Sequence, residues 1–268
     1  MTADNRLRAQ AASLADDLVA SLAFLTRFPL GWLGAEPSGR PDFRRSSRMF
    51  PVVGALVGLV AGIVIVVGAS LGAPSLVAVA LAVAATMLAT GGLHEDGLSD
   101  TFDGFGGGAT PERKLEIMRD SRIGSHGAAA LVFSILIRTA ALGALMAAGP
   151  WRAALALVAA EAVSRAAMMR VWHDLPAART DGLAHDTGPP DASAMLTAQA
   201  VALVIALIAV WPALGLLPAI AGILLSLAGT YILILYARSQ IGGRTGDTLG
   251  ACQQIAVVLF LVGVASAI

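Results

Sequence analysis

Residues 50–72 read FPVVGALVGLVAGIVIVVGASLG, and this run decides the class of the fold. It contains no charged residue, and Ser70 is its only polar side chain. A helix of about 20 consecutive apolar residues is long enough to cross the hydrocarbon core of a bilayer. The run therefore predicts a membrane-spanning helix.

Six further apolar runs follow along the chain, at 75–93, 127–148, 151–172, 195–212, 214–236 and 248–268. Pro212 separates two of them, and Gln253 and Gln254 make the last one the least apolar. The composition agrees, because 57% of the residues are hydrophobic and only 13% are charged, whereas soluble domains carry roughly 25% charged residues. We therefore predict an all-α, polytopic integral membrane protein with about seven transmembrane helices, in one domain that covers residues 1–268.

The segment before the first span has a different pattern. Leucines fall at helical spacing in it, at Leu7, Leu14, Leu18, Leu22 and Leu25. We interpret residues 6–27 as an amphipathic helix on the membrane surface; a helix tucked against the bundle is the alternative. Asp16 and Asp17 interrupt the apolar stretch, so we do not expect a cleaved signal peptide. Residues 1–49 are accordingly assigned to a cytoplasmic or interfacial segment.

The basic residues are distributed very unevenly about these spans. With seven spans, one side of the membrane carries the N-terminal segment and the loops 94–126, 173–194 and 237–247. Of the 18 Lys and Arg residues, Arg152 alone lies on the opposite side, while Arg138 and Arg165 lie inside spans. Because Lys and Arg accumulate on the cytoplasmic side, we predict a multi-pass protein of the cell inner membrane whose active site faces the cytoplasm. The formal net charge of zero gives no indication of nucleic-acid binding.

The most unusual polar stretch is GGLHEDGLSDTFDGFGGG, residues 91–108, at the end of the second predicted span. If that helix continues, Asp96, Asp100 and Asp103 lie on one face, because they stand at positions i, i+4 and i+7. Two unit charges ~6 Å apart repel by about 3 kcal/mol at an effective dielectric constant of 20. Mg²⁺ is typically bound by one or two carboxylates together with a substrate's phosphates. We therefore predict a Mg²⁺–diphosphate site in an acidic active-site loop, residues 94–126; a solvated acidic loop is the alternative.

Other polar residues in this loop allow two interpretations each. His94 is either a general base beside the acids or an ordinary hydrogen-bonded histidine. Arg119, Asp120 and Arg122 either bind phosphate or form the exposed end of a helix predicted over residues 111–122.

Two further features lie outside the loop. The turn IGGRTGDTLG, residues 241–250, places Asp247 at the mouth of the last span, where it adds a carboxylate to the same site. Inside the fourth span, Glu161 and Arg165 stand at positions i and i+4. A charge inside a bilayer costs at least ~2.5–3.5 kcal/mol on insertion scales, so we favour a structural ion pair between these two residues.

Seven stretches together resemble the cobalamin-5′-phosphate synthase family, whose members are also called adenosylcobinamide-GDP ribazoletransferases. They are FLTRFP (24–29), FPVVG (50–54), GGLHEDGLSDTFDG (91–104), LEIMRDSRIGSHGAAAL (115–131), VSR (163–165), AARTDGLA (177–184) and GGRTGDTLGA (242–251). They occur in the family's order over nearly the whole chain, and the block at 91–104 is highly specific. Glu95 departs from the family pattern, in which an apolar residue is more usual, so Glu95 is a poor ligand candidate.

The resemblance implies a reaction and its partners. Adenosylcobinamide-GDP reacts with α-ribazole, or with its 5′-phosphate, to give adenosylcobalamin or its 5′-phosphate and GMP, and Mg²⁺ is required. This reaction completes the nucleotide loop of vitamin B12 at the lipid bilayer, and other late cobalamin-pathway enzymes are expected partners.

Candidate site residues follow from the matching stretches. The expected metal ligands are Asp96, Asp100, Asp103 and Asp247. A catalytic role is also expected for Asp96, Asp100 and Asp103, and His94 is a candidate catalytic base. Substrate-binding roles are expected for Arg27, Arg119, Asp120, Arg122, Arg165, Arg179, Gly243 and Thr245.

Two other protein classes share some of these features. A membrane prenyltransferase also binds Mg²⁺ and diphosphate at aspartates, but it typically has two separate Asp-rich motifs, one in each half of the chain. In this sequence the first motif is present, and Asp247 is the only aspartate in the position of a second one. A cation transporter would bind its ion at acids within the membrane, and Glu161 is the only acid deep in a predicted span. Substrate-dependent release of GMP separates the transferase from both classes.

Overall fold

The structure is a computed structural model that describes residues 3–34, 42–181 and 187–268, with side chains from residue 13 onward except at residues 32 and 33. The predicted position Leu7 and the end of the AARTDGLA stretch therefore lie outside the described side chains. Within the described ranges the regular structure is helical, apart from an isolated bridge between Ala177 and Arg244. The predicted all-α class is thus confirmed.

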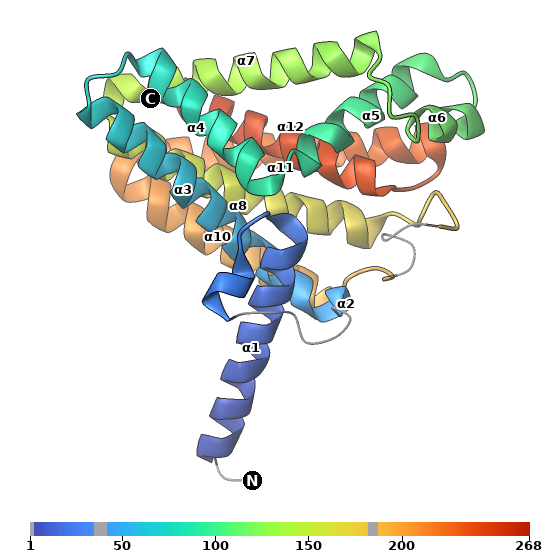
Figure 1. The fold of residues 1–268 in the computed structure, drawn as a ribbon, viewed down its shortest axis with the longest axis horizontal. Helices are drawn as coiled ribbons and strands as arrows, with labels where there is room; N and C mark the ends of the chain where they lie inside the picture. The colour runs from blue at the N-terminus through green and yellow to red at the C-terminus, as the bar shows by residue number, and fades with distance from the viewer. Residues whose placement is uncertain (1–2, 35–41, 182–186) are drawn as a thin grey trace.

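The helices follow one another along the chain (Figure 1). They are α1 (Ala3–Leu25), the 3-10 helix η1 (Leu30–Leu33), α2 (Phe43–Ser46), the 3-10 helix η2 (Ser47–Met49), α3 (Phe50–Ser70), α4 (Ser75–Thr90), α5 (Leu93–Gly107), α6 (Pro111–Ile117), α7 (Ser125–Ala148), α8 (Pro150–Asp174), α10 (Ala192–Leu214), α11 (Leu216–Ile241) and α12 (Gly246–Ser266).

Five helical segments are long and apolar enough to cross a membrane: Phe43–Ser70, which includes α3, and the helices α7, α10, α11 and α12. Helices α4 and α5 pass the same test together, although they are bent by 91°. The polytopic membrane class is therefore confirmed, while the predicted number of about seven spans becomes five or six in the described residues.

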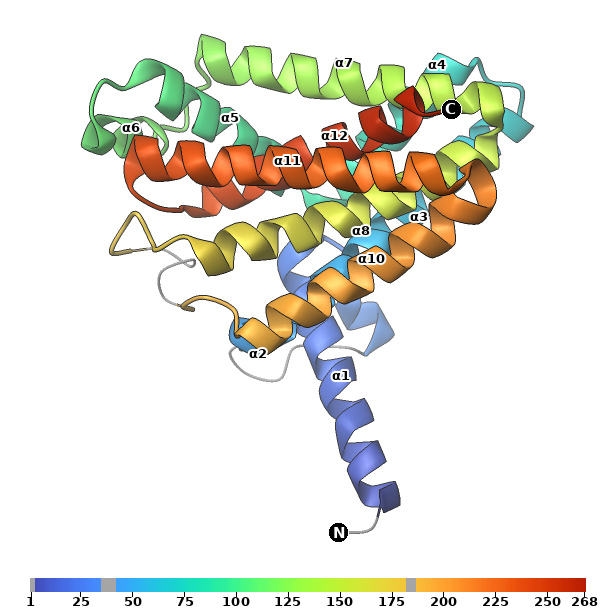
Figure 2. The same ribbon diagram turned by 180° about the vertical axis from the view of Figure 1, so that it is seen from behind.

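Helix α8, which corresponds to the predicted span at 151–172, largely explains why the structure has fewer candidate membrane spans than predicted. This helix carries Glu161, Arg165 and Arg170 along its length. It packs against α3, α7, α10, α11 and α12, and most of its side chains are buried. Figure 2 shows α8 between α11 and α10. Protein rather than lipid surrounds its central charges, which is the usual setting for charges at membrane depth.

Two clusters of buried apolar side chains hold the helices together. One includes Ile65, Leu157 and Phe260, and the other includes Phe50 and Trp172. Both clusters take residues from α3, α8, α10 and α12; the single domain stays a prediction.

The second predicted span ends before the acidic stretch, and a new helix begins there. Gly91 and Gly92 have φ values of 66° and 73°. This left-handed conformation ends α4 and is readily adopted only by glycine. The expectation that the span simply continues through the acids is therefore wrong. Asp96, Asp100 and Asp103 nevertheless lie on one helix, α5, which keeps their predicted spacing on one face.

Helix α1 confirms the predicted N-terminal helix, and its C-terminal half takes the alternative placement against the bundle. Its C-terminal half packs against α2 and α3, where Asp17 forms ion pairs with Arg45 and Arg48. Leu25 is fully buried, whereas Leu14 is 42% exposed. The N-terminal end extends away from the bundle (Figure 1). Only this first part of the helix is free to lie on a membrane surface.

The polar connections gather at one end of the bundle. Helix α6, the chain after α8 and the turn between α11 and α12 lie at the right-hand end of Figure 1, and the short turns at Gly149 and Gly215 lie at the opposite end. Lys114 of α6 donates a 2.6 Å hydrogen bond to Gln240 near the end of α11. The two ends of the bundle therefore differ strongly in polarity, as the distribution of charged loops predicts.

Candidate active site

The acidic helix α5 packs directly on the first turns of α12, and two glycines make this close approach possible. A Cβ atom on Gly97 would lie 2.7 Å from the backbone carbonyl oxygen of Asp247, and a Cβ atom on Gly250 would lie 3.2 Å from the Cα atom of Gly97. A side chain at either position would push the two helices apart. The contact brings together two acidic segments that are far apart in the sequence.

Four carboxylates near this contact are close enough for their charges to interact. Asp100, which is partly exposed, interacts electrostatically with Asp96, Asp103 and Asp247, and also with the guanidinium group of Arg179. Asp247 interacts with Asp96 as well. The structure thus joins the predicted fourth carboxylate to the predicted three. Because like charges repel at this range, a bound cation would stabilise the group.

A cavity of about 220 Å³ lies beside these carboxylates, and we name it the α5–α12 cavity. Asp96, Asp247 and His94 form the polar part of its lining. The His94 side chain is 1% exposed, and its Nε2 atom makes no hydrogen bond to any described residue. The remaining side chains of the lining are apolar or aromatic, namely Phe24, Leu93, Met168, Trp172 and Leu249. The predicted base and two predicted ligands therefore share one cavity.

Asp103 has a different environment from the other three carboxylates. It is 8% exposed, and its two oxygens accept hydrogen bonds from the backbone N–H groups of Gly124, at 2.7 Å, and Gly127, at 2.8 Å. These groups belong to the N-terminal end of α7, where the helix dipole favours an anion. Asp103 therefore anchors α7 to α5, a positioning role that the predicted metal-ligand assignment did not include.

The carboxylates form an open set rather than a closed metal cage. Within the described ranges, no group of three His, Cys, Asp or Glu side chains is arranged to hold a metal ion by itself. Mg²⁺ usually keeps several waters and is completed by substrate phosphates. The oxygen donors of Asp96, Asp100 and Asp247 fit this ion in a complex with a phosphate substrate.

One predicted substrate-binding arginine, Arg179, lies beside the carboxylate group, and another, Arg27, lies against the turn that precedes α5. Arg179 donates a 3.0 Å hydrogen bond to the carbonyl oxygen of Leu115 and lies 3.5 Å from Asp247, with 16% of its side chain exposed. Arg27 is exposed and lies over Gly91, where a Cβ atom would come within 2.7 Å of its Nε atom. Guanidinium groups form paired hydrogen bonds to phosphate oxygens, and the exposed Arg27 is the more accessible of the two.

The other charged candidates of the loop pair with surface partners. One Nη atom of Arg119 donates to both oxygens of Asp181, at 2.6 and 2.7 Å, and Arg122 pairs with Asp120. Hydrogen bonds from the guanidinium and backbone N–H groups of Arg122 lower the pKa of Asp120 to about 2. None of the three predicted residues lines the α5–α12 cavity. The structure favours the second interpretation, an exposed helix end, although α6 itself stops at Ile117.

The predicted Glu161–Arg165 ion pair is confirmed. Both side chains are almost fully buried, at 1% exposure each, and Arg165 also donates to the hydroxyl of Ser164 at 3.3 Å. Gln253 of α12 donates to the same hydroxyl at 3.0 Å. Arg165 is thus committed to a buried network, so its predicted role as a direct substrate contact does not agree with its surroundings.

A second buried pair escaped the sequence analysis. Glu95 lies 3.6 Å from Arg138, and Glu95 accepts a 2.9 Å hydrogen bond from Gln254. Gln254 donates at the same distance to Gln253, so the network is continuous from α7 to α8. Glu95 is therefore a structural residue, in agreement with its prediction as a poor ligand. The signal was present in the sequence, because Arg138 is a charge in an otherwise apolar span and requires a partner.

The turn between α11 and α12 places Asp247. Thr245 caps α12 by accepting a hydrogen bond from the backbone N–H of Thr248, and its hydroxyl donates to Asp247 at 3.1 Å. Gly243 lies against the backbone of Pro176, and the buried Arg244 donates to the carbonyl oxygen of Trp172 at 2.8 Å. The predicted residues Gly243 and Thr245 thus position the site. Arg244, which was not among the candidates, fixes the turn against the end of α8.

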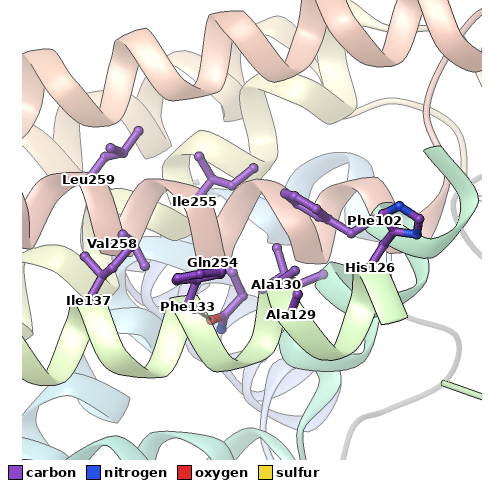
Figure 3. A pocket seen from close by; sticks show the side chains of 12 residues that line it. Phe102, His126, Ala129, Ala130, Phe133, Ile137, Gln254, Ile255, Val258 and Leu259 are labelled. Atoms are coloured by element: carbon purple, nitrogen blue, oxygen red, sulfur yellow. Dashed lines mark hydrogen bonds between the residues drawn. The ribbon is translucent and has the colours of Figure 1, made fainter. Parts of the chain in front are cut away.

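A larger cavity, of about 390 Å³, lies between α7 and α12 (Figure 3). Its lining is almost entirely apolar; Phe102 and His126 lie at one end and Leu259 at the other. No carboxylate lines it. It is therefore separate in chemistry from the acidic site.

Comparisons with known proteins identify a family that this chain resembles over nearly its whole length. The family model described as cobalamin-5-phosphate synthase matches residues 17–265. A protein of Azorhizobium caulinodans is 47% identical over 250 residues, which cover 92% of this chain and 94% of the relative. Proteins of Rhizobium etli and Brucella melitensis are 43% and 41% identical, over 94% and 97% of this chain and 97% and 100% of their own lengths. All three are named adenosylcobinamide-GDP ribazoletransferase. No solved structure matches the chain.

Proposed function

The chain belongs to the cobalamin-5-phosphate synthase family, and we propose that it joins adenosylcobinamide-GDP to α-ribazole, or to its 5′-phosphate, with release of GMP. This transfer completes the nucleotide loop of cobalamin. The shared name and the nearly complete coverage of the relatives support the assignment. With five or six helices in its described residues that are long and apolar enough to cross a bilayer, the protein is a multi-pass membrane transferase.

The convergence of Asp96 and Asp100 of α5 with Asp247 of α12 is the observation that carries this proposal. Splitting a diphosphate develops negative charge on the departing phosphate, so the site needs preorganised positive charge. A Mg²⁺ ion bound by one or two of these carboxylates together with the diphosphate itself would supply that charge. Arg179 adds a fixed guanidinium group at the same place, because Leu115 and Asp247 hold it there.

The transfer that we propose is a displacement at phosphorus. The 3′-hydroxyl oxygen of the ribose forms a bond to the phosphorus attached to the corrinoid arm, and the bond from that phosphorus to the GMP oxygen breaks. The hydroxyl proton passes to His94 or to Asp96, both of which line the cavity. Asp103 and Thr245 act as positioning residues, since they hold α7 and Asp247 in place.

The polarity of the bundle supports an active site at the cytoplasmic face of the inner membrane. The carboxylates lie toward the end of the bundle that carries α6 and the turn before α12 (Figure 1). That end also carries the exposed residues Arg113, Arg119 and Arg122, and cytoplasmic loops are the basic ones. Association with other late cobalamin-pathway enzymes stays a prediction.

An assay of GMP release from membranes that contain the protein tests the function. Adenosylcobinamide-GDP and α-ribazole are supplied with Mg²⁺ or with EDTA, and GMP and the completed corrinoid are measured together. We expect both products to form in equal amounts, only with Mg²⁺ and only with both substrates. The control variant is Glu116→Gln, whose side chain is 69% exposed on α6 and pairs only with Arg113 in the described residues. Absence of GMP release from the wild-type protein would overturn the proposal.

A further inference from the structure

We propose that the α5–α12 cavity binds the aromatic base of α-ribazole. The inference rests on the proposed function and deepens it, because it assigns a subsite to one substrate. The expected ligand class is a planar two-ring heterocycle that has apolar edges and a ring nitrogen able to accept a hydrogen bond.

The wall of the cavity carries aromatic side chains of the kind on which nucleic-acid bases stack. Trp172 and Phe24 contribute aromatic side chains to it. Two further rings support them from behind: the centroid of Phe50 lies 6.2 Å from that of Trp172, and the centroid of Phe43 lies 4.7 Å from that of Phe24. Rings that are held in this way lose little freedom when a base stacks on them, and stacking on aromatic side chains is a general mode of base recognition.

Two buried ring nitrogens in the lining have no hydrogen-bond partner among the described residues. The Nε1 atom of Trp172 and the Nε2 atom of His94 make no hydrogen bond to any described residue, although the two side chains are 2% and 1% exposed. Buried polar groups are normally paired. An indole N–H can only donate, so a ligand that satisfies it must accept a hydrogen bond. The free ring nitrogen of a benzimidazole nucleoside does this.

The position and size of the cavity fit a nucleoside acceptor. His94 and Asp96 belong to the same turn of α5, so a base in the cavity places its ribose next to Asp96 and Asp247. The volume of about 220 Å³ is below the roughly 300–1,000 Å³ of clefts for drug-sized ligands. A two-ring base matches this size, whereas a corrin macrocycle does not. Guanine is the competing two-ring base, but it carries several polar groups that apolar walls leave unpaired.

The first test fills the cavity and compares the two substrates. Met168 is 4% exposed and lies in the lining, and Met168→Phe narrows the space for a base. We expect the KM for α-ribazole to rise by about tenfold or more, with the KM for adenosylcobinamide-GDP unchanged within twofold. Met146→Phe, near the opposite end of the bundle on α7, is the control and should change neither constant. A rise in the KM for adenosylcobinamide-GDP instead would show that the cavity holds guanine and would overturn the inference.

The second test uses unmodified protein and needs no turnover. α-Ribazole or guanosine is titrated into the detergent-solubilised protein, and tryptophan fluorescence is followed. We expect α-ribazole to quench the emission saturably, guanosine to have no effect at the same concentration, and Trp172→Phe to remove the saturable change. Quenching by guanosine, or an equal response in Trp172→Phe, would overturn the inference. An active transferase with either of these results keeps the proposed function while losing the base site, so the two failures are distinguishable.

Discussion

The close contact between α5 and α12 can be tested by a single added methyl group. In Gly97→Ala the new Cβ atom would lie 2.7 Å from the carbonyl oxygen of Asp247 and 3.1 Å from the Cα atom of Gly250. Ordinary van der Waals contacts begin at 3.4 Å. Both obstacles are backbone atoms, so no flexible side chain can move aside.

The size of the effect follows from this geometry. To restore an ordinary contact, the helices must separate by about 0.7 Å at this point. Overpacking of this kind typically costs about 1–3 kcal/mol of stability. A displacement of 1 Å in a catalytic arrangement can lower the rate by about 100-fold. We therefore expect kcat for GMP release to fall by about 10- to 100-fold, because Asp247 moves away from Asp96 and Asp100.

The assay measures GMP release and thermal unfolding of the same purified protein in one detergent. Gly143→Ala is the matched control, because a Cβ atom at this position of α7 meets no atom within 4 Å. We expect the control to keep full activity and to gain up to about 1 kcal/mol of stability. If Gly97→Ala stays within twofold of wild-type activity, the contact does not position the carboxylates, and the reasoning from helix separation is refuted.

Three further predictions concern the charged groups. Asp100→Ala should yield an intact, membrane-inserted protein with almost no transferase activity, while Glu116→Gln stays active; near wild-type GMP release by Asp100→Ala would contradict the site assignment. Arg138→Met leaves Glu95 buried without its cation and should lower the free energy of unfolding by about 3–5 kcal/mol. The double variant with Glu95→Leu should recover most of this stability. An unchanged melting temperature in Arg138→Met would argue against the Glu95–Arg138 pair. EDTA should abolish turnover without lowering the melting temperature, because no three carboxylates in the described residues form a metal cage; loss of folded protein in EDTA would instead indicate a structural metal.

Those features of the site that depend only on the spacing of residues along one helix could be predicted from the sequence. Positions i and i+4 on a helix are neighbours whatever the surrounding fold, so the Glu161–Arg165 pair and the common face of Asp96 and Asp100 could be predicted without a structure. Asp103 shows the limit of this reasoning. Its position on the face was correct, but its hydrogen bonds to Gly124 and Gly127 depend on where the chain returns after α6.

The sequence by itself determined that the protein is a helical membrane protein with an acidic site at one end. Long apolar runs such as residues 50–72 require internal backbone hydrogen bonding in lipid, and that requirement does not depend on the neighbouring helices. Only the tertiary structure decided that α8 buries its charges, that Gly91 and Gly92 turn the acidic helix, and that Trp172 lies beside the carboxylates. These facts depend on contacts between residues far apart in the chain, and such contacts are set by how whole helix surfaces pack together.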